Sequence, residues 1–204
     1  TIWFSVPSML IYLVNMKVLK SGSCPDIRVF TFGGEGFPKS ILIKLFEEFK
    51  SQAKFINVYG PTEGTCICSS YDITQSDFND LNELPSLGRI NPNFSFQIVD
   101  SNNQESNKGE LIIIGPCVSA GYYNDKNKSE KVFGRFDSGE YYLNNYYRTG
   151  DLVSLKDGLL YFKGRVDNQI KHMGYRIELE EIENALNEIN FTKESAAIYK
   201  RLND

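Results

Sequence analysis

The hydrophobic pattern of residues 1–84 alternates between that of strands and that of a helix. Residues 27–32 form a short β-rich run that stops at a glycine-rich turn, and residues 55–59 form another that ends at Gly60-Pro61. Between them, Pro38 precedes apolar residues that share one face of a helix, namely Ile41, Leu42, Leu45 and Phe49. Strand, helix and strand in succession predict a mainly parallel sheet, in which ligands bind beyond the carboxyl ends of the strands.

The pattern changes to that of β structure in residues 85–166. Alternating apolar positions around Phe96 and the continuous apolar run 111–114 are typical of strands. The turn signal Asp157-Gly158, followed by the apolar residues 159–162, predicts a hairpin. Residues 124–146 are polar and aromatic, and we expect an irregular surface loop there.

The last part, residues 167–204, predicts one helix followed by the start of a strand at residues 195–199. The helix begins near Glu178, and its apolar face carries Leu179, Ile182, Leu186 and Ile189. The three parts together predict a protein of the α/β class.

Composition and charge argue against several classes of function. The 204 residues are 41% hydrophobic and 24% charged, with a net charge of -4, which is enough apolar content for a core. A mildly acidic chain without a basic run is a poor candidate for binding nucleic acid or an anionic membrane. The longest apolar run, residues 9–14, is too short to span a bilayer. We therefore expect no nucleic-acid partner, no membrane insertion and a cytoplasmic location.

The chain has few residues suited to zinc or to nucleophilic chemistry. It has a single histidine, His172, so a histidine-based zinc site or a catalytic dyad would depend on that one residue. Its four cysteines show no CxxC spacing, and we interpret them as reduced thiols.

Four segments carry residues suited to a nucleotide. The turn 33–36, Gly-Gly-Glu-Gly, lets the backbone approach a flat ligand, although steric reasons alone can require glycine there. In the segment 57–65 a tyrosine can stack on a base, a threonine can bind a phosphate oxygen, and Glu63 can hold Mg²⁺. In the segment 147–152, Asp151 at a strand end could accept hydrogen bonds from both hydroxyls of a ribose. The fourth segment is 164–183.

In this order, the four segments resemble the motifs of the AMP-forming adenylate enzyme superfamily, and residues 109–115 and 120–123 match a further motif of that family. The superfamily includes nonribosomal peptide synthetase adenylation domains, D-alanyl carrier protein ligases, acyl- and aryl-CoA synthetases and luciferase. Asn57 and Pro61 favour its amino-acid-activating members. The loop Gly174-Tyr175-Arg176 is similar to that of freestanding D-alanyl-ligase-like members.

The resemblance implies that the chain is the second half of a large adenylation domain plus the start of a small α+β C-terminal domain. Residues 1–84 would form a mainly parallel α/β part, residues 85–166 a distorted β-barrel part, and residues 167–204 the truncated beginning of the small domain. A phosphate loop with its lysine is expected upstream of Thr1, and a C-terminal catalytic lysine beyond Asp204. On this expectation the isolated 204 residues are inactive.

The resemblance also implies a two-step reaction. A carboxylate, favoured to be a small or apolar amino acid, attacks the α-phosphorus of ATP·Mg²⁺, pyrophosphate leaves, and the acyl-adenylate passes to a thiol. The expected acceptor is the phosphopantetheine arm of a carrier protein, or CoA. Two alternatives remain open: an acyl- or aryl-CoA synthetase, and a noncatalytic nucleotide-binding relative.

The family roles carry over to numbered residues of this chain. The resulting nucleotide-binding set is Gly34, Glu35, Gly36, Asn57, Tyr59, Gly60, Thr62, Asp151, Phe162 and Arg165. The turn 34–36 would line one face of adenine and Tyr59 the other. Thr62, Arg165 and the metal-placing Glu63 form the expected catalytic set.

The remaining roles concern the carboxylate substrate and domain movement. The substrate pocket would be lined by Phe4, Thr31, Gly33, Val58, Cys66 and Ile67. These residues carry no charge, which favours a small or apolar substrate. Asp167 matches the hinge residue, and Lys171 with the loop 174–176 would belong to the face presented for thioester formation.

Overall fold

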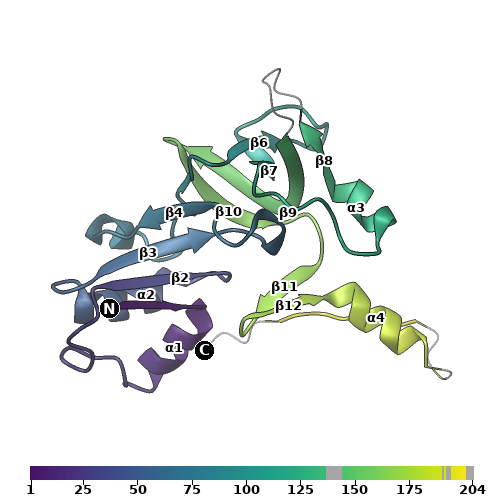
Figure 1. Ribbon diagram of the computed structural model, residues 1–204. Helices are drawn as coiled ribbons and strands as arrows, with labels where there is room; N and C mark the ends of the chain where they lie inside the picture. Colours follow the sequence, from purple (N-terminus) through teal and green to yellow (C-terminus); the bar gives the residue numbers. More distant parts are fainter. Residues whose placement is uncertain (137–143, 190, 192–193, 201–204) are drawn as a thin grey trace.

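The computed structural model describes residues 1–136, 144–189, 191 and 194–200. Its strands form two five-stranded sheets and one separate hairpin (Figure 1). The elements in chain order are β1 (Ile2–Ser5), α1 (Pro7–Asn15), β2 (Val29–Gly33), α2 (Lys39–Phe49), β3 (Lys54–Tyr59), η1 (Thr62–Gly64), β4 (Ser69–Asp72), η2 (Gln75–Asn79), β5 (Arg89–Ile90), β6 (Ser95–Val99), β7 (Lys108–Gly115), α3 (Lys126–Val132), β8 (Phe133–Phe136), β9 (Asn144–Lys156), β10 (Leu159–Arg165), β11 (Gln169–His172), β12 (Tyr175–Glu178) and α4 (Leu179–Asn187).

The first sheet has the strand order β1-β2-β3-β4-β5 and is mixed. β1, β2 and β3 run parallel, as the alternation of strand and helix predicts. β4 runs antiparallel to β3, because the two strands are joined by a short turn through η1 rather than by a crossover helix. β5 runs antiparallel to β4. β5 belongs to the first sheet, although its residues lie within 85–166, the range that the sequence analysis describes as β structure.

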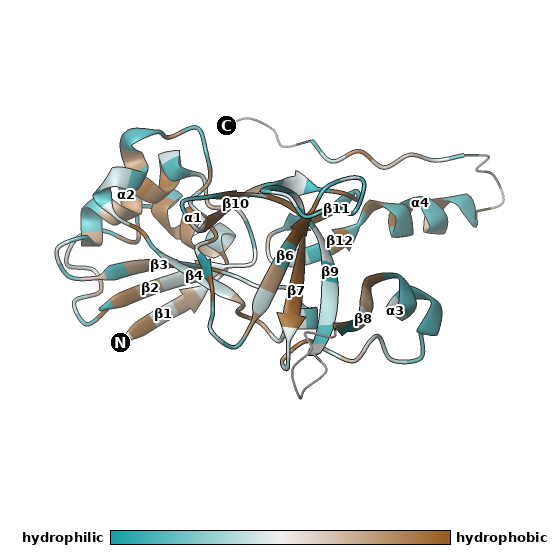
Figure 2. Ribbon diagram, turned by 90° about the horizontal axis from the view of Figure 1, so that it is seen from above, coloured by the Kyte–Doolittle hydropathy of each residue, from teal (hydrophilic) through white to brown (hydrophobic). Residues whose placement is uncertain are grey.

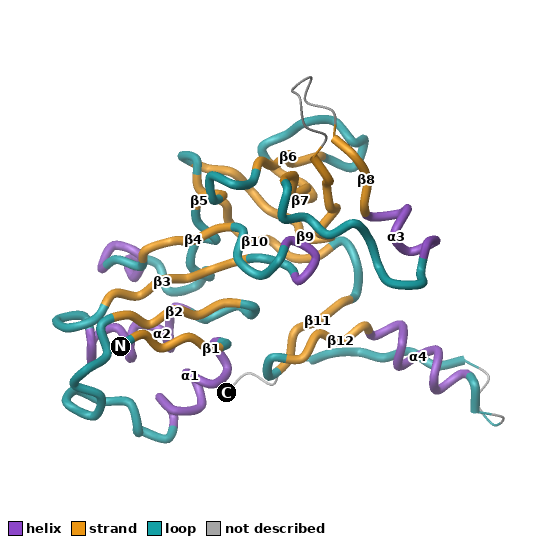
Figure 3. The backbone as a smooth tube through the Cα atoms, in the orientation of Figure 1, coloured by secondary structure: helices purple, strands orange, loops and turns teal. Residues whose placement is uncertain are grey.

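Helices α1 and α2 lie on one side of the first sheet (Figures 1 and 3). Pro38 precedes α2, and three of the predicted apolar positions, Leu42, Leu45 and Phe49, are fully buried. They pack with Phe30 and Phe32 of β2 in one hydrophobic cluster. Because successive strand residues point to opposite faces, Thr31 and Gly33 lie on the other face, away from the helices. This packing holds β2 and β3 against the helices and so fixes the position of their carboxyl ends.

The second sheet is antiparallel, with the order β10-β9-β7-β6 and β8 beside β9. Its apolar strand β7 runs through the middle of this part (Figure 2). β6 and β10 lie at opposite ends of the order, so within the described residues the sheet is open and does not close into the expected distorted barrel. The predicted hairpin is confirmed: Asp157 and Gly158 have φ of 54° and 73°, as a tight hairpin turn requires.

Two local sequence predictions are wrong. Residues 126–136 form α3 and β8 rather than an irregular loop, because the side chain of Asp125 accepts a hydrogen bond from the Lys128 amide and caps the helix. Residues 137–143 of the expected loop lie outside the described residues. Residues 195–199 form no strand, since the amide of Ala197 donates to the side chain of Glu183 instead of to a neighbouring strand.

The last part of the described chain consists of the β11–β12 hairpin and α4. The helix begins at Leu179, next to the residue predicted from the apolar pattern. Its apolar residues Ile182 and Leu186 remain 42% and 40% exposed, and Ile189, just after the helix, remains 48% exposed. None of the described helices combines the length and hydrophobicity that crossing a membrane requires.

Candidate functional site

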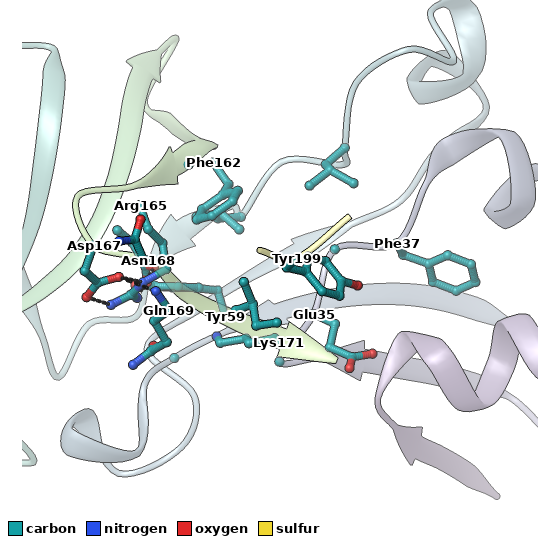
Figure 4. A pocket seen from close by; sticks show the side chains of 18 of the residues that line it. Glu35, Phe37, Tyr59, Phe162, Arg165, Asp167, Asn168, Gln169, Lys171 and Tyr199 are labelled. Atoms are coloured by element: carbon teal, nitrogen blue, oxygen red, sulfur yellow. Dashed lines mark hydrogen bonds and ion pairs between the residues drawn. The ribbon is translucent and has the colours of Figure 1, made fainter. Parts of the chain in front are cut away.

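A cavity of about 700 Å³ lies where the carboxyl ends of β2 and β3 meet β9, β10 and β11 (Figure 4). Every residue of the predicted nucleotide-binding set except Thr62 lines it, that is Gly34, Glu35, Gly36, Asn57, Tyr59, Gly60, Asp151, Phe162 and Arg165. Val58 and the predicted hinge residue Asp167 also line it. The fold therefore brings together residues that are far apart in the sequence, at the sheet edge where the strand pattern places a ligand.

Asp151 is the centre of a buried polar chain. Its Oδ2 accepts a 2.6 Å hydrogen bond from the Tyr59 hydroxyl, and its Oδ1 accepts a 2.6 Å hydrogen bond from Nη1 of Arg165. Burial, and then the charge of Asp151, raise the pKa of Tyr59 well above its usual range, so the hydroxyl keeps its proton. A carboxylate has about four lone-pair sites, which leaves Asp151 able to accept further hydrogen bonds from a ligand.

Asp151 lies inside β9 and not at the strand end that the sequence suggested. The register between β9 and β10 shifts between Phe162 and Gly164, and this bulge sets Arg165 directly opposite Asp151. Bulges of this kind change the direction in which side chains point. The irregular strand is therefore what aligns the arginine with the buried carboxylate.

Arg165 also holds Asp167, as Figure 4 shows. Its Nε and Nη2 atoms donate 2.6 Å hydrogen bonds to Oδ1 and Oδ2 of Asp167. Burial alone would lower the pKa of Arg165, but the two aspartates outweigh it and raise that pKa. Burial likewise opposes the ionisation of Asp167, yet the guanidinium keeps its pKa below the usual range. Both groups of this pair are therefore charged at neutral pH.

Gly150 makes room for this pair. Its φ is +70°, and a Cβ atom there would lie 2.7 Å from Nη2 of Arg165 and 3.2 Å from Oδ2 of Asp167. A side chain at position 150 would therefore be strained and would also displace the arginine.

Glu35 joins three segments at the opposite side of the cavity. Its Oε2 accepts a 3.1 Å hydrogen bond from the Ser8 amide at the start of α1, and its Oε1 accepts one of 2.5 Å from the Gly174 amide in the β11–β12 turn. Lys171 of β11 also lines the cavity, and its pKa is lowered chiefly by burial. The hairpin thus forms one wall of the cavity.

Thr62 and Glu63 lie in η1, outside the lining of this cavity. The Glu63 carboxylate is 5% exposed; it accepts a 2.7 Å hydrogen bond from the Tyr122 hydroxyl and bonds of 2.9 and 3.1 Å from Nη1 of Arg176. Burial raises the pKa of Glu63, but the bond from Tyr122, one from its own backbone and the charge of Arg176 outweigh that effect and lower it. The Glu63 carboxyl is therefore ionised at neutral pH.

This donor set fits one kind of metal. Among the described residues no three His, Cys, Asp or Glu side chains gather into a metal cluster. Mg²⁺ is commonly held by one or two carboxylates together with the phosphates of a substrate. A single buried carboxylate such as Glu63 is compatible with that mode and not with a site made by the protein alone.

The predicted substrate-pocket residues fall into two groups. Phe4, Thr31, Gly33 and Val58 share one face of β1, β2 and β3, because Phe4 pairs with Thr31 and Gly33 pairs with Val58. Of the six residues only Val58 lines the cavity. Cys66 and Ile67 lie in the turn after η1, where Cys66 is exposed with a φ of 80°.

The sequence analysis gave no role to several residues that line the cavity or contact Glu63. The cavity is also lined by Leu84, Pro85, Ile170 and Tyr199. Tyr122, which contacts Glu63, belongs to the recognised segment 120–123, so its motif was a signal that could have identified it. Leu84, Pro85 and Tyr199 lie outside every motif segment, whereas Ile170 belongs to the fourth segment, 164–183.

The fold of this chain is similar to that of solved adenylation domains. The Vibrio cholerae adenylation domain AlmE, solved in complex with glycyl-adenosine-5'-phosphate, superposes with a TM-score of 0.83 at 25% identity, covering 96% of this chain and 37% of that one. PA1221, an NRPS protein containing adenylation and PCP domains, superposes with a TM-score of 0.83 at 23% identity, over 98% of this chain and 40% of that one. At that identity the second likeness shows the fold alone.

The chain belongs to the AMP-binding enzyme family, whose pattern its residues 1–123 match. It is 38% identical over 203 residues to the D-alanine--D-alanyl carrier protein ligase of Listeria monocytogenes, which covers 98% of this chain. The chain spans 38% of the length of that relative. Membership of the family agrees with the resemblance drawn from the sequence motifs.

Proposed function

We propose that the protein carrying this chain is an ATP-dependent, AMP-forming ligase. It would activate a carboxylate, with a small or apolar amino acid as the favoured substrate, as an acyl-adenylate. It would then transfer the acyl group to the phosphopantetheine thiol of a carrier protein with release of AMP. One observation carries the proposal: the glycine turn 34–36, Tyr59 and the Asp151–Arg165 pair border a single cavity.

The nucleoside would bind between the two sides of this cavity. The free lone pairs of Asp151 accept hydrogen bonds from ribose hydroxyls, and Arg165 supplies positive charge near the ribose and phosphate. Adenine would lie between the backbone of the turn 34–36 and the ring of Tyr59, with Phe162 beside the nucleotide. These contacts position the reactants and neutralise charge, without a covalent enzyme intermediate.

The phosphates would extend toward η1. There Thr62 would donate a hydrogen bond to a phosphate oxygen, and the Glu63 carboxylate would hold Mg²⁺. Bound Mg²⁺ neutralises negative charge on the phosphates that develops as the bond to pyrophosphate breaks. The role of Glu63 here is to keep an anionic oxygen at a fixed place beside the phosphate chain.

Two observations bear on the identity of the substrate and of the acceptor. The sheet face that carries Phe4, Thr31 and Gly33 has no charged side chain among these residues, which suits a small or apolar amino acid. The relative named a D-alanine--D-alanyl carrier protein ligase makes D-alanine the first substrate to test and a carrier protein the first acceptor. Asp167 would act as the hinge about which residues 167–204, as the start of a small domain, change position.

ATP–pyrophosphate exchange tests the proposal in the whole protein that carries this chain. The panel contains D-alanine, small and apolar L-amino acids, and fatty and aryl acids. Exchange with one amino acid supports the amino-acid-activating function and identifies the substrate. Exchange only with fatty or aryl acids would instead indicate an acyl- or aryl-CoA synthetase. No exchange with any acid, while ATP still binds, would indicate a noncatalytic relative.

A matched pair of variants ties the result to the site. Asp151→Asn removes the charge at the proposed ribose contact, and we expect weaker ATP binding. Asp77→Asn changes a carboxylate that also accepts a tyrosine hydrogen bond, from Tyr71, but lies outside the cavity lining. Equal ATP affinity in both variants would show that Asp151 has no role in binding ATP.

A further inference from the structure

Tyr122 holds the Glu63 carboxylate from outside the cavity. Its hydroxyl donates a 2.7 Å hydrogen bond to Oε1 of Glu63, which lies 59 positions earlier in the chain. Neither residue belongs to the lining of the cavity. Burial, and then the bond to Glu63, raise the pKa of Tyr122 above its usual range, so the phenol keeps its proton and remains the donor.

The segment 117–122 contacts η1 and the residue after it at three points. Besides the bond from Tyr122, the Ser119 amide donates to the Glu63 carbonyl at 2.8 Å. The Thr65 hydroxyl donates to the Cys117 carbonyl at 2.7 Å. The bonds to backbone carbonyls fix where η1 lies against this segment, and the bond from Tyr122 fixes how the Glu63 carboxylate is turned.

The neighbouring helix α3 and the start of β8 hold Tyr122 in place. The Tyr122 amide donates a 2.8 Å hydrogen bond to Oγ of Ser129, in the middle of α3. The Tyr122 ring packs edge-on against Phe133, with 5.2 Å between the ring centres, and Nζ of Lys128 lies 5.4 Å from the centre of the Tyr122 ring. Since α3 buries none of its own residues, these contacts give the helix a role other than filling the core.

We propose that Tyr122, held by α3, is a positioning residue for the metal site: it occupies Oε1 of Glu63 and so leaves Oε2 to bind Mg²⁺. This inference rests on the proposed function, because it takes Glu63 as the metal ligand. Among the side chains that the structure describes, Oε1 accepts bonds from Tyr122 and Arg176, whereas Oε2 accepts only the longer bond from Arg176. A carboxylate has about four lone-pair sites on its two oxygens, so these two bonds fill Oε1.

Mn²⁺ binding to the ATP complex of the whole protein tests this, measured from the electron paramagnetic resonance signal of the free ion. In Tyr122→Phe, which keeps the ring against Phe133, we expect the Mn²⁺ affinity to fall about tenfold, because partners that orient a metal ligand commonly have effects of that order. ATP affinity in the presence of a chelator should be unchanged, since Tyr122 lies outside the cavity lining. Ser129→Ala should weaken Mn²⁺ binding about threefold, because the Tyr122 amide loses its acceptor.

Tyr71→Phe is the matched control, because it removes a 2.8 Å hydrogen bond from a tyrosine to another carboxylate, that of Asp77. Its Mn²⁺ affinity should equal that of the unaltered protein. An equal fall in Tyr71→Phe would overturn the inference, and so would a parallel loss of metal-free ATP binding in Tyr122→Phe, which would mean that the tyrosine supports the fold alone. Unaltered Mn²⁺ affinity in Ser129→Ala would overturn the role given to α3.

Glu63→Gln separates this inference from the proposed function. If Glu63→Gln weakens Mn²⁺ binding but Tyr122→Phe leaves it unaltered or tightens it, the inference is overturned and the proposed function stands. If Mn²⁺ binding does not respond to Glu63→Gln either, Glu63 does not hold the metal, and both the inference and that part of the proposed function are overturned.

Discussion

The Tyr59 hydroxyl and Oδ2 of Asp151 are 2.6 Å apart, although the two residues are separated by 92 positions in the chain. Tyr59 ends β3 of the first sheet, and Asp151 lies in β9 of the second. Their hydrogen bond therefore joins the two sheets at the cavity. Because both side chains are buried, the bond contributes to stability as well as to the site.

Tyr59→Phe should separate these two contributions. The variant removes one donor and keeps the ring, so we expect a loss of about 1–2 kcal/mol in the free energy of unfolding, together with weaker ATP binding. The control Tyr71→Phe removes the 2.8 Å hydrogen bond to Asp77, which lies outside the cavity lining. Urea unfolding and ATP titration of both variants should show lost stability in each and lost ATP affinity only at position 59. Unchanged ATP affinity in Tyr59→Phe would mean that the hydroxyl serves the fold alone.

Arg165→Lys should fail to replace the arginine. The guanidinium bonds Asp151 and Asp167 through three different nitrogen atoms, and a lysine ammonium cannot match that planar geometry. We expect a loss of stability of about 2–4 kcal/mol, since the carboxylates are left partly unpaired. ATP affinity, measured by calorimetry, should fall as well.

Arg148→Lys provides the comparison for that variant, because Arg148 pairs with Glu110 on the same sheet but does not line the cavity. It should lose stability without losing ATP affinity. A similar loss of ATP affinity in both variants would assign the effect to the sheet and not to the site.

The stability of the protein should depend on the ionisation of Glu63 in acid. Its pKa is lower in the folded protein than the ordinary value of 4.5. The unfolded chain therefore binds the proton first, and the stabilising effect is complete above about pH 4.5 and lost as the pH falls through the lower, folded-state pKa. The difference in unfolding free energy between the unaltered protein and Glu63→Gln should shrink over that acid range. A difference that stays constant from pH 6 down to about pH 3 would contradict the lowered pKa.

The elements that sequence reasoning predicted well are those with a strong hydrophobic period. α2 and α4 were predicted close to their observed starts because their apolar residues recur at helical spacing. The β9–β10 turn was predicted because Asp-Gly readily adopts positive φ. α3 and β8 were missed, since α3 buries none of its residues and so has no apolar stripe to detect.

The contacts of the candidate site could not be predicted from hydrophobic periodicity. Hydrophobic period alone does not relate Tyr59 to Asp151 or Glu63 to Arg176, because these pairs are 92 and 113 positions apart. The first pair entered the predicted set through the resemblance to known motifs. The second was not predicted, because the resemblance placed Arg176 in the loop presented for thioester formation and implied no partner for its side chain. Contacts between side chains of different sheets depend on tertiary packing, which a local pattern does not encode.

Gly150→Ala should disrupt the cluster around Arg165 without removing any of its members. At a φ of +70° an added Cβ atom would lie 2.7 Å from Nη2 of Arg165, so the arginine must shift. Backbone strain alone at positive φ costs about 1–2 kcal/mol. Gly22→Ala isolates that strain, because Gly22 has a φ of +79° and nothing within 4 Å of an added Cβ atom. We expect both variants to lose stability in urea unfolding, Gly150→Ala by more, and only Gly150→Ala to bind ATP more weakly. Equal losses of stability in the two variants would show that Arg165 and Asp167 accommodate the extra atom, and the cluster would then be less rigid than its short hydrogen bonds indicate.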